Sequence, residues 1–447
     1  MPSPSSPSSP STPSAAQVEH LLAELIGQMP PVAGRSDARH LDQPPRGRPR
    51  LLPSLALWAG LLTCVLQGWS SQLALYRLLS SGRFWHYPRF AISDQAVYKR
   101  LAQAGTKPLE GLFQALTALL LDRLEPLRPA AFQDLAPFAR EVVALDESTL
   151  DQMARALPAL QDRRAVPDGS PTLLAGRIAA LFDVRRQLFR QVVYRTDATQ
   201  NEKVAARDLV ASLSPGSLIL ADLGYFGFRW FDDLTAGGHF FLSRLRAKTS
   251  FSRLHTYYEH DHTLDALVFL GAYRADRAQH AVRLLQFQTG ATTYRYITNV
   301  LDPQLLSLRE AAALYARRWD IELAFRLLKE HLHLHLIWSA KPVVIQQQLW
   351  AALIISQVLH ALQFEIAARA GCDPFEVSLP LLVEYLPRYA AAGVDPIAAF
   401  VADGRRAGFI RPSTRLKPRA PDIALDQITP LPPALALERT PRYADKR

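Results

Sequence analysis

Tyr315, Arg318, Glu322 and Lys329 lie in one short stretch and have side chains suited to an anionic substrate. Their spacing is Y-x2-R-x3-E-x6-K. Each residue of a helix turns the direction by about 100°, so the four side chains fall within an arc about 60° wide. A carboxylate would then point into a cleft with two cations beside it. An ordinary amphipathic helix with i,i+4 ion pairs is the alternative interpretation of the same pattern.

Two aspartates extend this set. Asp146 ends the apolar run EVVALD and Asp222 ends SLILAD, so both are expected at the rim of a sheet, where α/β active sites gather. Three carboxylates held together repel one another unless a divalent cation neutralises them. Oxygen ligands select Mg²⁺ or Mn²⁺, and two such ions serve in-line displacement at phosphorus. The pattern predicts Asp146, Asp222 and Glu322 as catalytic metal ligands, with Arg318 and Lys329 contacting DNA phosphates.

The composition agrees with a polyanionic partner. Lys and Arg number 51 against 41 Asp and Glu, which gives a formal net charge of +10. This balance favours nucleic acid first and an anionic membrane second. Cys64 and Cys372 are too few for a disulfide framework or a structural zinc site, which fits a reducing, cytosolic setting. The first residues lack the cationic start and apolar run of a secretory signal, so none is expected.

The elements that must position these residues fall into four predicted parts. Residues 1–50 are expected to be a disordered, basic segment with one short helix. Residues 51–135 are expected to form an all-α, DNA-binding region. Residues 136–365 are expected to form an α/β catalytic domain, with β-forming residues concentrated at about 247–300. Residues 366–447 are expected to be a helical region followed by a basic tail.

One short helix of the N-terminal region has the features of a DNA-reading helix. Ser93 is its predicted N-cap, and the helix runs from Gln95 to Ala104. It bears Lys99 and Arg100 and follows an aromatic and basic turn, so it suits a helix-turn-helix that reads the major groove. A surface helix of a bundle is the alternative. The uncharged stretch before it has the 3–4 residue rhythm of globular helices, so no membrane span is expected.

The chain resembles bacterial insertion-sequence transposases of the Asp-Asp-Glu type, in the group called the insertion sequence four family. The four residues of the opening paragraph match that family's signature without a gap. Asp222 begins the family's D-x-G-[YF] sequence, and Asp146 lies in a comparable run, VVALDEST. The resemblance covers about residues 140–365. It implies a ribonuclease-H-like core with a β-rich insertion between Asp222 and Glu322.

The same resemblance implies a function. It implies a homodimer that synapses the terminal inverted repeats, cleaves the transposon ends with Mg²⁺, often through a hairpin, and transfers the strands into target DNA. Such a protein would work in the bacterial cytoplasm, at the nucleoid. Tyr315 would join the DNA contacts, and Trp319 would stack on a flipped base. Core packing is the alternative for Trp319.

Two other functions remain open from the residues. The same fold could serve a nuclease without strand transfer, or a domesticated and inactive DNA-binding derivative. Glu147 departs from the family, which more often has a small residue there. The run His331, His333 and His335 is not expected to bind metal, because alternate residues of a helix diverge. Asp232 and Asp233 are expected to be solvated.

Overall fold

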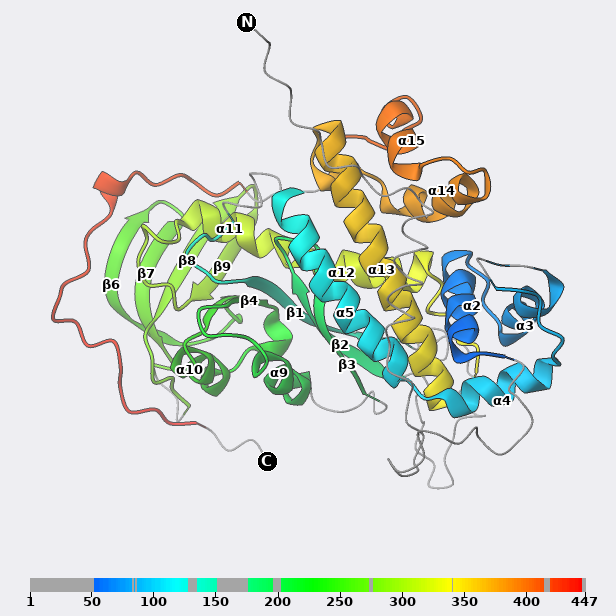
Figure 1. The fold of residues 1–447 in the computed structure, drawn as a ribbon. Helices are drawn as coiled ribbons and strands as arrows, with labels where there is room; N and C mark the ends of the chain where they lie inside the picture. The colour runs from blue at the N-terminus through cyan, green and yellow to red at the C-terminus, as the bar shows by residue number, and fades with distance from the viewer. Residues whose placement is uncertain are drawn as a thin grey trace, which may run out of the picture. The chain divides into compact units, whose positions relative to one another are not determined.

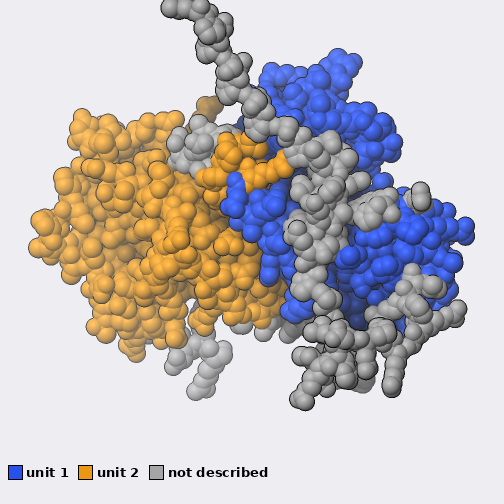
Figure 2. Space-filling view, in the orientation of Figure 1, with its two compact units in different colours: residues 1–122, 330–413 blue, residues 123–329, 414–447 orange. Residues whose placement is uncertain are grey.

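The computed structural model divides the chain into two compact units (Figure 2). The helical unit comprises residues 1–122 and 330–413, and the sheet unit comprises residues 123–329 and 414–447. The predicted N-terminal segment with its short helix, and the aromatic turn residues Trp85 and His86, lie outside the residues that the structure describes. The described residues are 52–127 apart from 83, 85 and 86, together with 135–150, 176–195, 202–272, 276–339, 341–413 and 419–443.

Serine caps and a glycine stop define the helices at the start of the helical unit. Ser71 and Ser93 each accept a hydrogen bond from a backbone N–H in the first turn of the helix that follows. Gly105, with φ of 71°, ends the helix that the sequence predicts at this place. The helices are α2 (Ser54–Leu66), α3 (Gln72–Ser81), α4 (Asp94–Ala104) and α5 (Lys107–Leu124), which runs to the border of the unit.

The central element of the helical unit is the 29-residue helix α13 (Pro342–Ala370). Among the described residues it is the one helix long and apolar enough to cross a membrane. However, 89% of its most apolar stretch is buried inside the protein, as in the core helix of a globular unit. Gln347 donates hydrogen bonds to the carbonyls of Leu101 and Gly105, at 2.9 and 2.7 Å. The helices α14 (Leu379–Ala391) and α15 (Pro396–Asp403) follow.

The sheet unit contains one nine-stranded sheet with the order β3-β2-β1-β4-β5-β9-β8-β7-β6 (Figure 1). β1, β4 and β5 are parallel neighbours, whereas β2 pairs antiparallel with both β1 and β3. The last four strands form an antiparallel meander that joins the sheet through β9 and β5. The bounds are β1 (Val142–Thr149), β2 (Arg177–Asp183), β3 (Leu188–Arg195), β4 (Leu218–Ala221), β5 (Phe240–Arg244), β6 (Phe251–His260), β7 (Thr263–Leu270), β8 (Val282–Thr289) and β9 (Thr292–Thr298).

Helices cover both faces of this sheet. α9 (Glu202–Val210) and α10 (Phe228–Ala236) lie on one face, where Leu209 and Phe231 share a buried core with Leu145 of β1. α11 (Leu308–Arg317) and α12 (Trp319–Arg326) lie on the other face. Because side chains alternate along a strand, Asp146 and Leu145 point to opposite faces.

The long helix predicted over residues 307 to about 332 is divided into three parts. α11 begins with a capping box in which Ser307 and Glu310 bond reciprocally. Arg318 joins α11 to α12, and a π-helical turn, Leu327–His331, follows α12. Such turns insert a residue into the helical ladder and are frequent at functional sites. Past Leu327, the even helical spacing assumed from the sequence therefore does not hold.

The C-terminal segment, residues 419–443, lies along the meander; we call it the strap. Arg439 donates from Nε to the carbonyl of Ala278 at 2.9 Å, and the hydroxyl of Tyr443 donates to Asp232 at 2.9 Å. Asp232 is buried and also accepts from the backbone N–H groups of Gln279 and His280. The expectation that Asp232 is solvated is therefore wrong, while Asp233 is exposed as expected.

Candidate active site

The two aspartates lie on adjacent parallel strands. The last paired residues of β1 and β4 are Leu145 and Ala221, and Asp146 and Asp222 come directly after them. Neighbouring strands are about 4.8 Å apart, so the two carboxylates start from neighbouring positions at one edge of the parallel strands. Asp222 follows β4 as predicted. Asp146 does not end its strand, because β1 continues to Thr149 by pairing with β2.

Arg318 joins Asp146 to Glu322. Its Nη2 lies 2.6 Å from Oε1 of Glu322, and its Nη1 lies 3.6 Å from Oδ2 of Asp146. Only 6% of Arg318 is exposed, so the guanidinium is largely withdrawn from water. A buried ion pair of this kind interacts more strongly than a surface pair. Residues of β1 and of the α11–α12 junction, more than 170 positions apart in the sequence, thus meet at one cation.

The electrostatics of Asp146 show that the three acids affect one another. The pKa of Asp146 is raised to about 7, mainly by burial and in part by the charges of Asp222 and Glu322. The backbone N–H of Glu147, at 2.8 Å, and the guanidinium of Arg318 act in the opposite direction. Holding all three carboxylates ionised at neutral pH therefore requires more positive charge than Arg318 supplies.

Chemistry and charge make the three carboxylates suitable for a hard divalent cation. Their ligand atoms are all oxygens, and a cation would relieve the repulsion that raises the pKa of Asp146. In the described part of the chain, however, no group of three or more His, Cys, Asp or Glu side chains is arranged to hold a metal ion. In this structure Oε1 of Glu322 accepts a hydrogen bond of 2.6 Å from Nη2 of Arg318 instead.

Tyr315 lies beneath the site rather than on its surface. It is 3% exposed, and its hydroxyl donates a long hydrogen bond of 3.4 Å to the carbonyl of Ala221. Its ring packs on Tyr296 at 4.6 Å between centroids, with Arg244 and Arg318 at 5.6 and 5.9 Å. Burial raises the pKa of its hydroxyl. Tyr315 therefore supports two arginines, and in this structure it is not accessible for the predicted DNA contact.

Trp319, by contrast, is 50% exposed. The guanidinium of Arg318 lies 5.4 Å from its ring, and Leu323 is exposed one turn further along the same helix. This exposure rules out the alternative that Trp319 packs in the core. An exposed indole beside a cation is an arrangement on which a nucleobase could stack.

The other predicted DNA contacts differ in their surroundings. Lys329 lies half-buried within the π-helical turn. Lys99 is exposed on α4, whereas Nη2 of Arg100 donates to the hydroxyl of Ser54 at 2.8 Å. Glu147 points away from Asp146 and pairs with Arg177 at 3.1 Å, so it does not join the three acids.

Two cations that the sequence analysis passed over lie beside Asp222. Arg244 and Arg246 are exposed at the carboxyl end of β5, the strand next to β4. Arg246 lies over Phe226 at 5.2 Å and donates to the carbonyl of Leu223 at 3.4 Å. The signal was present in the sequence as R-x-R following the strand-like run HFFLS, because alternate residues face the same side.

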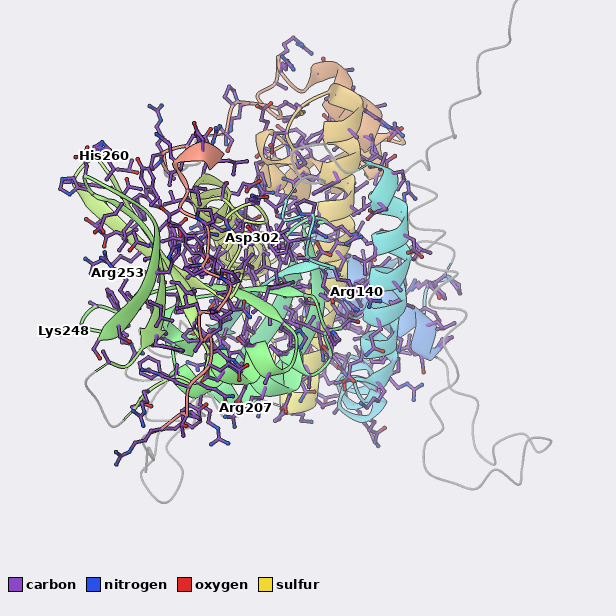
Figure 3. The ribbon with its side chains drawn as sticks, turned by 90° about the vertical axis from the view of Figure 1, so that its left-hand side faces the viewer. Arg140, Arg207, Lys248, Arg253, His260 and Asp302 are labelled. Atoms are coloured by element: carbon purple, nitrogen blue, oxygen red, sulfur yellow. The ribbon has the colours of Figure 1, made fainter. Side chains whose placement is uncertain are left out.

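Figure 3 places other cations of the sheet unit well apart from one another. Arg253 and His260 lie along β6, at the outer edge of the sheet, and Arg207 lies on α9. Arg253 pairs with Glu259 at 2.6 Å, so its charge already has a partner. These residues offer controls for experiments on the cations around Asp222.

Comparison with known proteins finds similarity to transposases. Residues 142–358 match the family model described as "Transposase DDE domain". A protein of Sinorhizobium fredii (strain NBRC 101917 / NGR234) named "Putative transposase y4zB" is 26% identical over 195 residues. The aligned region is 42% of this chain and 51% of that protein, so the chain spans about half the length of the curated relative it matches. The match to the transposase DDE domain begins at the first residue of β1, includes all three acids, and supports a transposase role for this protein.

Proposed function

We propose that this protein is a DNA transposase that cleaves transposon ends and transfers the cut strands into target DNA by in-line displacement at phosphorus. The observation that carries the proposal is the contact of Arg318 with Asp146 and Glu322, together with the charge of Asp222, which raises the pKa of Asp146. The match to a transposase DDE domain over the same residues supports it. The proposal names the three acids as the catalytic residues.

In this proposal the strands β3-β2-β1-β4-β5 are a ribonuclease-H-like core. The strand order and the antiparallel placement of β2 in an otherwise parallel centre support this assignment. The meander β6 to β9 would be the family's β-rich insertion, since it lies between Asp222 and Glu322 in the sequence. The carboxyl ends of parallel strands are where α/β sheets gather their catalytic side chains.

Asp146, Asp222 and Glu322 would hold two Mg²⁺ ions, or Mn²⁺, and the chemistry supplied on binding would be activation of the attacking water or 3′-hydroxyl and stabilisation of the leaving oxygen. For this, Glu322 must leave Arg318 and turn toward the two aspartates. A buried guanidinium that loses its carboxylate needs another anion. A DNA phosphate offers the same bidentate geometry. Arg318 would then hold the scissile strand at the place where the acids act.

The remaining DNA contacts follow from exposure and charge. Arg244 and Lys329 would bind further phosphates, and Trp319 would stack on an unpaired base. Lys99, exposed on α4, would contact the terminal repeat through the helical unit. The protein would act as a homodimer on two ends, in the bacterial cytoplasm at the nucleoid.

A plasmid assay tests the proposal. A supercoiled plasmid carrying two copies of the element's own ends is incubated with Mg²⁺ and with the wild-type protein, Asp222→Asn or Asp233→Asn. The wild type and Asp233→Asn should cleave at the ends, because Asp233 is an exposed residue of α10. Asp222→Asn should fall to the background level. Equal cleavage by all three proteins, or by none, would contradict the assignment.

Labelled end fragments decide between transposition and simple hydrolysis. A transposase should join the labelled 3′ ends to an unlabelled target plasmid. A nuclease of the same fold would cut the ends and leave no joined product. Binding without cutting would indicate an inactive derivative.

A further inference from the structure

We infer that Gln187 and Asp320 are positioning residues, which fix the rotation of α12 and so aim Glu322 at the aspartates. We call this pair the α12 clamp. The inference rests on the proposed function, in which Glu322 is a catalytic acid. It adds two residues that lie outside the four-residue signature and touch neither substrate nor ion.

Asp320 lies in the first turn of α12 and is 1% exposed. Its Oδ2 accepts a hydrogen bond of 2.7 Å from Nε2 of Gln187 and lies 3.2 Å from Nε of Arg317. A carboxylate taken out of water is strongly destabilising unless such partners are present. Arg317 lies three residues before Asp320 and moves with it, whereas the bond from Gln187 comes from the β2–β3 turn and is directional, so it is kept in one orientation of α12 only.

Gln187, the other residue of the clamp, also has a fixed orientation. Gln187 lies in the turn between β2 and β3 and is 2% exposed. Its φ is 57°, a left-handed conformation that residues other than glycine seldom adopt. Its backbone N–H donates to the carbonyl of Asp183, and its side-chain amide also donates to the carbonyl of Val184, both at 2.8 Å. The amide is therefore oriented before it meets α12.

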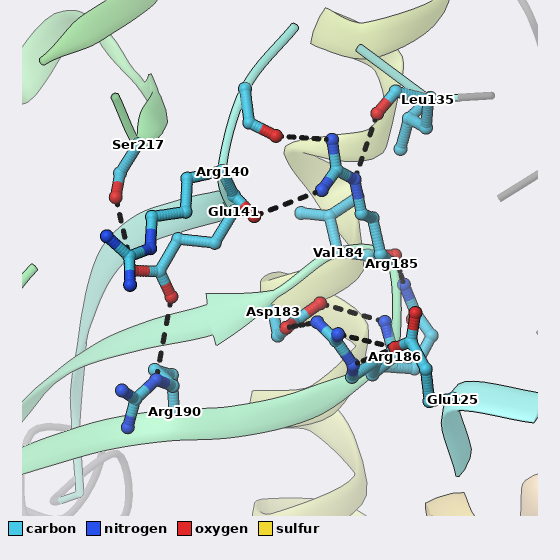
Figure 4. A network of polar contacts seen from close by, with 12 residues as sticks. Glu125, Leu135, Arg140, Glu141, Asp183, Val184, Arg185, Arg186, Arg190 and Ser217 are labelled. Carbon is cyan, nitrogen blue, oxygen red and sulfur yellow. Dashed lines mark hydrogen bonds and ion pairs between the residues drawn. The ribbon is translucent and has the colours of Figure 1, made fainter. Parts of the chain in front are cut away.

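The whole β2–β3 turn is anchored to the sheet unit (Figure 4). Arg185 donates to the carbonyls of Leu135 at 3.0 Å and Ala139 at 2.9 Å. Arg186 bonds Asp183 at 2.9 Å through Nη1 and Glu125 at 2.9 Å through Nε. A turn fixed by two arginines is a rigid support for a polar contact.

The geometry of α12 explains why such a support matters. α12 has eight residues, begins at a junction with another helix and ends in a π-helical turn. Its other contact with the β2–β3 hairpin includes the rings of Phe325 and Phe189, at 5.8 Å, and apolar rings define a rotation less sharply than a hydrogen bond. Asp320 and Glu322 are two residues apart, or about 200° around the helix. Holding Asp320 on one side therefore aims Glu322 on the other.

Exchanging the hydrogen-bond donor and acceptor of the clamp tests this inference, because the lengths of the two side chains do not change. Gln187→Glu sets two carboxylates against each other and should release α12. Gln187→Glu with Asp320→Asn restores a donor and an acceptor of the same lengths in the opposite direction. Gln288→Glu, at an exposed position of β8, makes the same chemical change away from the clamp.

Two measurements are made on each folded protein. Gln187→Glu should weaken Mn²⁺ binding, measured by calorimetry, by about tenfold, as for other groups that orient metal ligands. It should also speed hydrogen exchange in residues 319–326. The double variant should recover part of both losses, because the carboxylate introduced at position 187 cannot replace the bond from Gln187 to the carbonyl of Val184. Gln288→Glu should match the wild type.

Unchanged exchange at 319–326 in Gln187→Glu, or a double variant as impaired as Gln187→Glu, would overturn the inference. The same measurements distinguish the role of the clamp from the assignment of the three acids as metal ligands. If exchange responds as expected while the wild type and Asp222→Asn bind Mn²⁺ equally, the clamp holds α12 but the assignment of the acids as metal ligands fails.

Discussion

Arg318 supplies the positive charge among the three acids of the free protein. It bonds Glu322 closely and Asp146 at longer range, while Asp222 acts through its charge on Asp146 and on the hydroxyl of Tyr315. In the proposed function, divalent ions would replace the guanidinium as the partner of Glu322. The repulsion between the negative charges, more than the packing of the side chains, therefore limits how closely the three carboxylates approach one another.

The first prediction concerns Asp146 and pH. In the folded protein its pKa is raised from 3.8 to about 7, so between these values the folded state holds a proton that the unfolded chain has lost. Stability contributed by this group is therefore lost as pH rises through that window. Asp146→Asn should raise the free energy of unfolding at pH 8, by on the order of 2–4 kcal/mol, and change it little at pH 4.

Thermal melts at pH 4 and pH 8 measure this effect, and added Mg²⁺ provides a second observation. Mg²⁺ should raise the melting temperature of the wild type at pH 8 and leave that of Asp146→Asn unchanged. If Asp146→Asn melts below the wild type at pH 8, the negative charge of Asp146 does not destabilise the folded protein.

The second prediction concerns Arg244. If its guanidinium binds a phosphate, Arg244→Ala should weaken binding to end DNA and lower the slope of log affinity against log salt by about one. Arg253→Ala is the matched control, because Arg253 is exposed but already paired with Glu259. Equal slopes for the two variants in a salt titration of DNA binding would remove Arg244 from the DNA path.

At the scale of elements, the strap is part of the sheet unit. Asp232 accepts hydrogen bonds from two backbone N–H groups and from the hydroxyl of Tyr443, and all three bonds are 2.8 to 2.9 Å long. Ile428, Leu431, Leu435 and Leu437 pack against a small buried cluster of the meander. The strap therefore covers an apolar surface of the meander, and its Tyr443 adds a third hydrogen bond to the buried Asp232.

The third prediction follows from these bonds. Tyr443→Phe should destabilise the sheet unit by about 1 kcal/mol, and Asp232→Ala should cost about 3 kcal/mol because it leaves buried N–H groups unpaired. Asp233→Ala, at the neighbouring exposed position, should stay within about 0.5 kcal/mol of the wild type. Urea unfolding of the three variants tests this, and equal effects of Asp232→Ala and Asp233→Ala would contradict it.

The fourth prediction concerns α13. His360 is buried in this helix, and burial lowers its pKa to about 4. Between about pH 6.5 and pH 4 the unfolded chain binds a proton that the folded chain excludes, so stability falls as pH falls. His360→Gln should flatten this loss, which is on the order of 2–3 kcal/mol. If the melting temperature falls by the same amount from pH 7 to pH 4.5 in His360→Gln and in the wild type, this prediction is wrong.

Local sequence was sufficient to predict the elements but not their tertiary contacts. The apolar runs before Asp146 and Asp222 and the helix capped by Ser93 are all formed as expected, because each depends on neighbouring residues. Asp232 was misjudged because its partner Tyr443 is 211 residues away. The contact between Gln187 and Asp320 spans 133 residues, and no spacing rule reveals it.

For the whole molecule, the same limit applies to the grouping of segments. Residues 330–413 belong with the N-terminal helices, since Gln347 and Gln357 of α13 donate to Leu101 and Thr117, 246 and 240 positions earlier. The chain crosses between the two units after residues 122, 329 and 413. The signature stretch thus ends at the border of the sheet unit, with Lys329 as its last residue before α13 and its partners begin.

The claim on which the whole account depends is that Asp146, Asp222 and Glu322 hold divalent ions together. Anomalous diffraction from crystals of the protein with end DNA and Mn²⁺ tests it most directly. Manganese peaks are expected about 2.1 Å from oxygens of all three carboxylates, with Arg318 turned from Glu322 to a phosphate. Manganese peaks elsewhere, with Glu322 still bonded to Arg318, would contradict it.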